Sequence, residues 1–339
     1  MSIVTEGVEF FNTTVLEDRK ESAGRLLPRV PSVVRHAMSP HGRLVGMTSV
    51  GAEIRFVSEA PTFNLYLSTT GPHAQVTVYR GEYEHSNHPI EAGKVQVIEL
   101  GTPPNLAMVA KERLDGAYDS SVWRIFVDRG VIYFHGLDTF GCPTRPPEAS
   151  ELPKVKWLAY GSSITNAWGR GYPHQAAREL GVQVMNKGFS GSCHIEPQLV
   201  DYLASLDWDF ATCELGVNMR GSFEPNEFKK RATYLLDKFR SARPGKPVGL
   251  ITVYPNANHF LVDKEDDIEA SRQAAFSDTL RALAAERAGD GVFLIEGDSI
   301  MDRFACLGTD LLHPSDYGHI RMGMNLAGIL REKLSTFSK

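Results

Sequence analysis

Residues 156–165 read KWLAYGSSIT, an apolar run that ends in a glycine and two serines. The run 156–160 is typical of a strand that is buried on both faces of a sheet. Comparable runs recur at 209–213, 248–253 and 292–295, and segments with helical spacing of apolar residues lie between them. This alternation predicts an α/β fold with a parallel sheet and helices on both of its faces.

The expected helices each carry one apolar stripe that would face the sheet. Pro225 suits the first position of one of these helices, because a helix needs no N–H donor there. The three clearest stripes are Phe228, Ala232, Leu235 and Phe239; Phe276, Leu280 and Leu283; and Ile320, Met324, Ala327 and Leu330.

The first 140 residues follow a different period. Apolar and polar residues alternate at 52–56, 63–67 and 74–78, which indicates half-buried strands. Two later runs, 122–127 and 131–134, flank Asp128-Arg129-Gly130 and predict a hairpin. Several short strands separated by turn residues predict an antiparallel β-sandwich, of the jelly-roll type.

A proline-rich stretch near residues 143–153 separates the two patterns and is expected to be the linker. We therefore expect an N-terminal β-sandwich domain over 1–145 and an α/β domain over 154–339.

Composition excludes several classes of function. The net charge is −5 and lysine and arginine do not cluster, so neither nucleic acid nor an anionic membrane is an expected partner. The first residues lack the pattern of a signal peptide, and no apolar stretch is long enough to span a bilayer. The four cysteines are widely spaced and form no metal-binding group. We expect a cytoplasmic protein that needs neither metal nor cofactor.

An acid and a histidine lie three residues apart in Asp310-Leu-Leu-His313-Pro. At this spacing the carboxylate can reach the imidazole within one turn, hold one ring nitrogen protonated and leave the other free to accept a proton. Such a pair needs a nucleophile, and Ser163, directly after the first strand, is the best candidate. A serine hydroxyl becomes a good nucleophile once a base takes its proton.

Two further motifs follow strands of the same sheet. They are Asn186–Gly191 and Gly216–Asn218, and ligands of such sheets bind at the carboxyl ends of the strands. A tetrahedral intermediate needs hydrogen-bond donors for its oxyanion. The backbone N–H groups of Ser163 and Gly191 and the side-chain amide of Asn218 could be these donors.

Together the four motifs resemble those of the SGNH (GDSL-type) hydrolase superfamily, over about residues 155–335. The resemblance implies a flavodoxin-like three-layer α/β/α domain with a Ser163–His313–Asp310 triad that acts on carboxylic esters or thioesters. It makes 154–339 the expected catalytic domain, and the domain over 1–145 could bind a substrate or carbohydrate, or form a wall of the active site. A β-rich domain before the hydrolase domain resembles a subgroup with certain carbohydrate esterases and an acyltransferase-type enzyme of tetracycline biosynthesis. Two positions depart from the family pattern: Ser162 stands in place of an Asp, and Met219 in place of an Asp that often follows the asparagine.

Several other residues have a simpler interpretation. The literal Gly297-Asp298-Ser299 follows the last strand, so it is not the nucleophile motif. Trp168, Arg170 and Arg220 could touch substrate, but a surface loop is the simpler interpretation. The stretch 255–267 could equally be a loop over the site or an inert connection. His194 could line the pocket, although a surface histidine is the simpler interpretation. Residues that we expect to be structural or merely packed are His319, Glu214 and Cys193.

The main hypothesis is a serine esterase acting on a small ester such as an acetylated carbohydrate. Transfer of the acyl group to another alcohol or amine would use the same acyl-enzyme and stays open. A non-catalytic glycan-binding protein is the third hypothesis, and the complete triad argues against it. The sequence does not indicate the oligomeric state.

Overall fold

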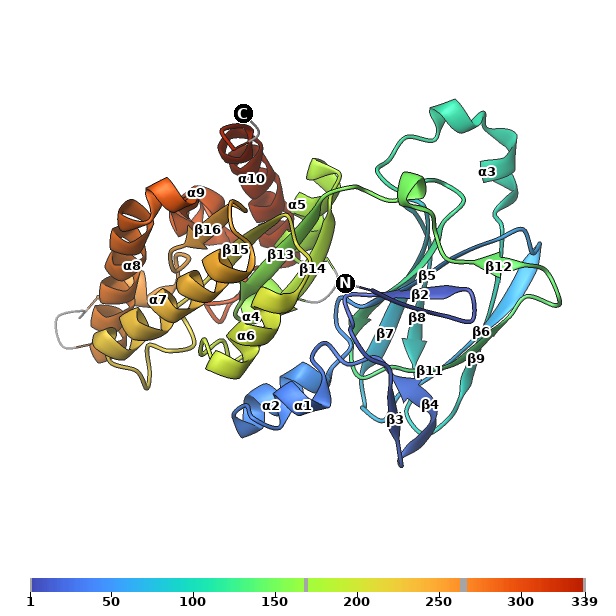
Figure 1. Cartoon of the computed structure of the whole chain (residues 1–339), viewed down its shortest axis with the longest axis horizontal. Coiled ribbons are helices and arrows are strands. Elements are labelled where there is room, and N and C mark those ends of the chain that lie inside the picture. Colours follow the sequence, from blue (N-terminus) through green and yellow to red (C-terminus); the bar gives the residue numbers. More distant parts are fainter. Residues whose placement is uncertain (1, 168–169, 263–266, 338–339) are drawn as a thin grey trace. The chain divides into compact units, whose positions relative to one another are not determined.

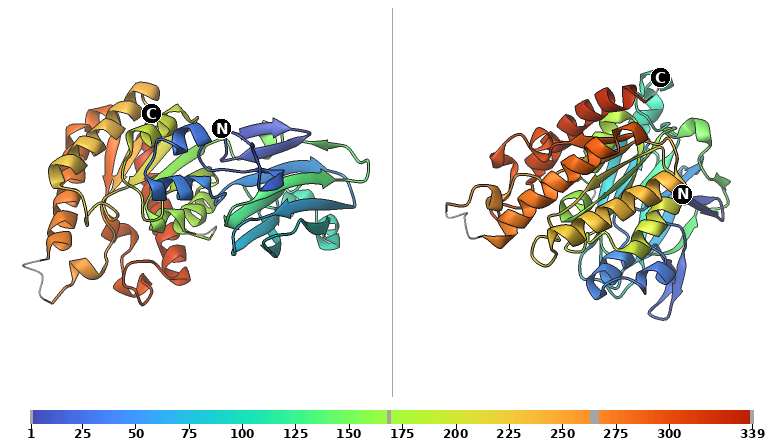
Figure 2. Two further views of the ribbon diagram at one scale, coloured as in Figure 1. Left: turned by 90° about the horizontal axis from the view of Figure 1, so that it is seen from below. Right: turned by 60° about the vertical axis from the view of Figure 1, so that its left-hand side comes forward.

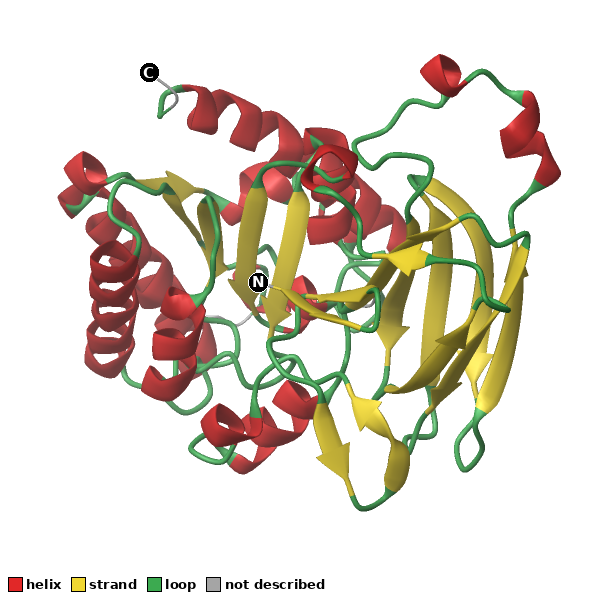
Figure 3. Cartoon of the chain, turned by 45° about the vertical axis from the view of Figure 1, so that its right-hand side comes forward, coloured by secondary structure: helices red, strands yellow, loops and turns green. Residues whose placement is uncertain are grey.

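The computed structural model describes residues 2–167, 170–262 and 267–337. Contacts divide the chain into two compact units, one comprising 1–32 and 46–154 and the other comprising 33–45 and 155–339. The first unit is built mainly of strands, whereas strands alternate with helices in the second (Figure 1, Figure 3). None of the helices described over these ranges is both long and apolar enough to cross a bilayer.

The N-terminal unit contains two antiparallel sheets. The strands of the first, in spatial order, are β1 (Ser2–Thr5), β2 (Val8–Phe11), β5 (Glu53–Ser58), β10 (Trp123–Arg129), β7 (Ala74–Arg80) and β8 (Tyr83–Ile90), with β12 (Thr144–Arg145) also paired to β5. Those of the second are β3 (Glu17–Arg19), β4 (Ser22–Leu26), β11 (Tyr133–Asp138), β6 (Thr62–Ser68) and β9 (Gln96–Gly101). Short helical turns connect them: α3 (Pro104–Met108), η1 (Lys111–Arg113) and η2 (Ala149–Glu151).

The alternation seen in the sequence correctly identifies the residues of this unit's core. Its apolar positions at 52–56, 63–67 and 74–78 are all buried. Phe63 packs edge-on against Phe56 and Trp123, which come from the facing sheet. The antiparallel β-sandwich that the sequence predicts is therefore confirmed.

The hairpin predicted around residues 128–130 is wrong. β10 pairs with β5 and β7, whereas β11 pairs with β4 and β6, so the two strands belong to different sheets. Ile132, which lies between them, is fully buried. The connection therefore joins the two sheets, and Ile132 in it is buried in the core that the sheets share.

The C-terminal unit contains one parallel sheet with the strand order β14, β13, β15, β16, β17. In sequence order this is 2-1-3-4-5, the flavodoxin-like arrangement, in which the order reverses between the first and third strands. The expected α/β fold is confirmed. The strands are β13 (Lys156–Gly161), β14 (Gln183–Gly188), β15 (Phe210–Glu214), β16 (Val248–Ile251) and β17 (Val292–Ile295).

Helices cover both faces of this sheet. α5 (Tyr172–Leu180) packs against α10 (Asp316–Ser335), and α7 (Pro225–Ala242) packs against α6 (Pro197–Ser205) and α8 (Ile268–Glu286). The three longest helices, α7, α8 and α10, run in roughly the same direction in the right-hand view of Figure 2. Shorter elements complete the unit: α4 (Ser163–Asn166), α9 (Gly297–Ile300), η3 (Ala257–His259), η4 (Ala288–Asp290) and η5 (Phe304–Cys306).

The apolar stripe predicted on α10 is only half correct. Ala327 and Leu330 are buried, but Ile320 and Met324 are each 52% exposed. The buried face contains Gly323 instead, and a Cβ at that position would overlap the Gln175 side chain of α5. Two helices approach closely where a glycine removes the side chain between them, so the face of α10 that carries Gly323, Met322 and Leu326 contacts α5 while Ile320 and Met324 stay exposed.

The boundaries of the two units differ in one segment from those predicted from the sequence. Residues 33–45, which contain most of α1 (Ser32–Arg35) and α2 (Pro40–Met47), belong to the C-terminal unit. Two hydrogen bonds hold the segment there. The Ser39 N–H donates to Glu196 Oε1 at 2.8 Å, and His41 Nε2 lies 3.0 Å from the Ser190 carbonyl oxygen.

Candidate active site

The candidate nucleophile lies where β13 ends. Ser163 is the first residue of α4, and its Oγ is 2.8 Å from His313 Nε2. Its neighbour Ser162 is fully buried and accepts a hydrogen bond from the Ile164 N–H, so it caps α4. Of these two serines, only Ser163 presents its hydroxyl to the histidine.

The turn before the nucleophile requires glycine. A Cβ at Gly161 would overlap Thr165 Oγ1 and lie 2.7 Å from Glu214 Oε2. The missing side chain lets the Glu214 carboxylate come close enough to accept the Ser162 N–H at 2.7 Å. The buried Glu214 carboxylate therefore fixes the backbone that leads to Ser163.

Asp310 and His313 form the local pair that the spacing predicts. His313 Nδ1 lies 2.7 Å from Asp310 Oδ2, while Asp310 Oδ1 accepts the N–H groups of Leu312 and His313 at 3.0 Å each. The carboxylate thus closes its own turn with one oxygen and orients the ring with the other. Because a carboxylate oxygen accepts, Nδ1 carries the ring proton and the Nε2 lone pair faces Ser163.

This pair is open to solvent. The side chains of His313 and Asp310 are 46% and 54% exposed. Desolvation opposes ionisation of Asp310, but hydrogen bonds from His313 and the backbone outweigh it and hold the pKa of the carboxyl below its ordinary value. An exposed pair of this kind contributes little to stability, so its main effect is to orient the ring.

Two of the three candidate oxyanion donors, Gly191 and Asn218, lie on neighbouring loops. Gly191 is exposed and has φ +64°, a conformation that favours glycine. The Cys193 N–H lies 3.2 Å from Asn218 Oδ1 and joins the two loops. Since a backbone N–H can only donate, the oxygen of the Asn218 amide must face Cys193, which leaves its NH₂ group directed elsewhere.

The Gly191 loop is also tied to the nucleophile helix. Asn166 Nδ2, at the end of α4, donates to Ser190 Oγ at 2.7 Å. The Phe189 N–H donates to the Gly161 carbonyl oxygen. These bonds bring together, at the carboxyl ends of β13, β14 and β15, the loops that carry Ser163, Gly191 and Asn218.

Glu214 is the most perturbed carboxylate near the site. It is buried, and desolvation raises its pKa to about 7 despite hydrogen bonds from Ser162 and Thr165. Its Oε1 has no hydrogen-bond partner among the described protein atoms. These contacts agree with the structural role expected from the sequence.

His319, His194 and Cys193 make contacts within the protein. The Tyr172 N–H lies 3.3 Å from His319 Nδ1, and desolvation lowers the pKa of His319 to about 4. His194 packs beside Phe223, and desolvation lowers its pKa as well. Cys193 is buried and desolvation raises its pKa, which disfavours the thiolate.

The remaining candidates divide into three groups. Arg220 is committed to Glu269 and to two side-chain amides, so it has a structural role. Arg170 is exposed, whereas Trp168 and part of the stretch 255–267 lie outside the described residues. Ser299 of the literal GDS sequence donates to the Glu296 carbonyl oxygen at the start of α9.

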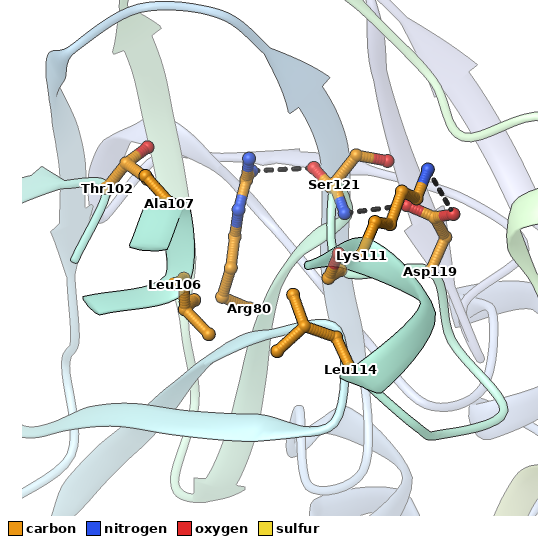
Figure 4. A pocket seen from close by; sticks show the side chains of 9 residues that line it. Arg80, Thr102, Leu106, Ala107, Lys111, Leu114, Asp119 and Ser121 are labelled. Carbon is orange, nitrogen blue, oxygen red and sulfur yellow. Dashed lines mark hydrogen bonds and ion pairs between the residues drawn. The ribbon is translucent and has the colours of Figure 1, made fainter. Parts of the chain in front are cut away.

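A pocket of about 220 Å³ lies in the N-terminal unit (Figure 4). Arg80 crosses it, stacks over Trp123 and donates to the Ser121 carbonyl oxygen, and burial lowers the pKa of this arginine to about 10. Leu106 and Leu114 supply apolar walls. Within residues 2–167, 170–262 and 267–337, no group of His, Cys, Asp or Glu is arranged to hold a metal ion.

Sequence reasoning missed His41. It lies 149 residues before Ser190, and the sequence around it has no apolar pattern that predicts a strand or helix beside the site. Only the fold brings it beside Gly191.

Comparison with solved structures identifies relatives of the same two-part fold. The salicylyl-acyltransferase SsfX3 from a tetracycline biosynthetic pathway is 15% identical and superposes with a TM-score of 0.75, over 100% of this chain and 97% of its own. A structure described as a GDSL-like lipase from Bacteroides ovatus is 17% identical, with a TM-score of 0.69 over 96% and 95% of the two chains. A family two carbohydrate esterase from Cellvibrio japonicus is 14% identical, with a TM-score of 0.64 over 100% and 98%.

No curated protein matches the chain at the level of sequence. The model of the GDSL-like lipase/acylhydrolase family, however, matches residues 156–331, which is more than half of the chain and contains all four motifs. The chain therefore belongs to the GDSL-like lipase/acylhydrolase family and is a serine hydrolase that acts on ester bonds.

Proposed function

We propose that the protein is a carboxylic esterase in which Ser163 is the nucleophile, His313 the general base and Asp310 the residue that orients His313. One observation carries the proposal. Ser163 Oγ, His313 and Asp310 are joined by contacts of 2.8 and 2.7 Å in the order that proton transfer needs. The loop connections between Ser163, Gly191 and Asn218 support an oxyanion site beside them.

In the first half of the reaction, Ser163 Oγ attacks the ester carbonyl carbon and its proton passes to His313 Nε2. The N–H groups of Ser163 and Gly191 and the amide of Asn218 stabilise the oxyanion of the tetrahedral intermediate. When the intermediate collapses, His313 returns the proton to the leaving alcohol and an acyl-enzyme remains. In the second half, His313 deprotonates a water molecule, whose attack releases the acid and restores Ser163.

For the substrate, we propose a small acyl ester such as an acetylated carbohydrate. This rests on full-length similarity of fold to a carbohydrate esterase. Within the N-terminal unit, the Arg80 pocket is a candidate place for a hydroxyl-rich group of a carbohydrate. An ester panel that varies acyl length and alcohol, including acetylated sugars, tests this part. Equal rates on all alcohols would contradict a carbohydrate preference.

Acyl transfer is the second candidate, favoured by the full-length similarity of fold to a salicylyl-acyltransferase. The acyl-enzyme would be the same, and an alcohol or amine would replace water in the second half. Product analysis in the presence of candidate acceptors separates the two functions. Free acid as the sole product would exclude transfer to those acceptors.

The nucleophile is tested by labelling with a fluorophosphonate and mapping the modified peptide. We expect the label on Ser163, loss of turnover in Ser163→Ala and an unchanged fold, because the hydroxyl is half-buried and contributes little stability. Ser299→Ala, in the literal GDS sequence, is the matched control and should retain activity. A label on any other residue would refute the assignment.

A further inference from the structure

We propose that His41, on α2, is a positioning residue that holds the Ser190–Gly191 peptide in the orientation that the oxyanion site needs. The inference deepens the proposed function and rests on it. It adds a group from the segment 33–45, far from the four family motifs in the sequence.

The geometry singles out one peptide unit. His41 Nε2 lies 3.0 Å from the Ser190 carbonyl oxygen, and the Ser192 hydroxyl lies 3.5 Å from the same oxygen. A Cβ added to Gly191 would lie 3.0 Å from the same His41 nitrogen. The imidazole therefore lies directly against the peptide whose N–H is the proposed oxyanion donor. Because a carbonyl oxygen only accepts, Nε2 must carry a proton in this contact.

The Ser190 carbonyl and the Gly191 N–H belong to a single planar peptide and point in opposite directions. Fixing the direction of the oxygen therefore fixes the direction of the N–H. Glycine at 191, with φ +64°, could also adopt other backbone conformations, including ones in which this peptide is turned over. A carbonyl oxygen turned toward the substrate would repel the oxyanion, so the hydrogen bond from His41 selects the productive orientation.

The same hydrogen bond should also make the Gly191 N–H a stronger donor. Accepting a hydrogen bond polarises the carbonyl, and polarisation along the peptide makes its N–H a better donor. The gain would be largest in the transition state, where the oxyanion carries the most charge. We therefore expect the effect in kcat rather than in substrate binding.

His41 is itself held in place. The Ser39 N–H donates to Glu196 Oε1 at 2.8 Å, and Ser39 Oγ accepts the Gly42 N–H at 3.2 Å in the first turn of α2. Glu196 directly precedes α6, and Ser190 lies in the same connection between β14 and α6. The start of α2 is thus attached at two points of that one connection, which is the arrangement that a positioning contact requires.

The test compares the wild type with His41→Ala and His41→Gln in the hydrolysis of p-nitrophenyl acetate. His41→Ala should lower kcat about five- to tenfold, the value of one hydrogen bond, with KM changed less than about twofold. The Ki of phenylboronic acid, whose serine adduct is tetrahedral and anionic, should rise by about the same factor as kcat falls. A glutamine amide can donate to the Ser190 carbonyl, so His41→Gln should recover most of the rate.

His36→Ala is the matched control, since His36 is an exposed histidine of the same segment, and it should behave as the wild type. If His41→Ala does not fold, His41→Leu keeps the bulk of the ring without the donor and replaces it in the comparison. Wild-type kcat in the folded variant, a loss confined to KM, or His41→Gln as impaired as His41→Ala would each overturn the proposal. Ser163→Ala is measured alongside: if it remains active, the proposed function fails, whereas an inactive Ser163→Ala with an unaffected His41→Ala refutes only the role of His41.

Discussion

Glu214 should make the stability of the protein fall as the pH rises. Its carboxyl is buried beneath the nucleophile turn, where desolvation raises the pKa from 4.5 to about 7. Because the folded pKa lies above the unfolded one, the folded state binds more protons between these values. The free energy of unfolding therefore decreases with rising pH in that window, which is opposite to the usual behaviour of a salt-bridged acid.

The size of the effect follows from the two pKa values. Between about pH 5 and about pH 8, ionisation of this one group should reduce the free energy of unfolding by about 2–3 kcal/mol. Glu214→Gln removes the ionisation and keeps an oxygen that can accept the Ser162 N–H, which now lies 2.7 Å from Oε2. Compared with the wild type, the variant should gain about that amount of stability on going from the lower to the higher pH.

The assay is urea unfolding of the wild type and Glu214→Gln at both pH values. Taking the difference between the two proteins cancels the titration of all other groups to a first approximation. Glu332→Gln, at an exposed position of α10, is the matched control and should show no such difference. If the stability of the wild type and that of Glu214→Gln change equally as the pH rises, Glu214 is not a buried carboxyl with a raised pKa.

Three further substitutions test other parts of the site. Asp310→Asn should lower kcat by about 10³–10⁴, because an amide that donates to Nδ1 leaves Nε2 protonated and unable to act as a base; a loss below tenfold would contradict this. Asn218→Ala should lower kcat about 10²–10³ with little change in KM, as expected for an oxyanion donor, and a change in KM alone would exclude that role. Gly161→Ala should destabilise the fold through overlap with Thr165 and Glu214, and an unchanged melting temperature would refute the packing argument.

The features that the sequence predicted correctly are local or periodic. Asp310 and His313 lie within one turn, so their contact depends on few dihedral angles. The buried apolar runs and the alternation of strands with helices are enough to predict a parallel sheet. In such a sheet, the residues that bind ligands gather at the carboxyl ends of the strands. This is why the sequence alone predicts that Ser163 lies next to His313, although 150 residues separate them.

The features that were wrong or missed depend on contacts between distant parts of the chain. The apolar spacing on α10 predicts a stripe that includes Ile320 and Met324, but both are exposed, because close approach at Gly323 determines the face that contacts α5. The predicted hairpin at 128–130 is wrong because β10 and β11 pair with strands of different sheets. His41 was missed because α2 is short and its partner, Ser190, is 149 residues away.

The candidate site combines two kinds of organisation with different energetic requirements. The Asp310–His313 pair is closed by its own turn, so its ordering costs little entropy even though it is exposed. The proposed oxyanion site has no such local closure, because Gly191, Asn218 and the nucleophile turn come from separate loops. Hydrogen bonds between those loops, and the buried Glu214 below them, must supply the rigidity. Substitutions in these supporting contacts should therefore impair catalysis through the oxyanion site while leaving the Asp310–His313 pair intact.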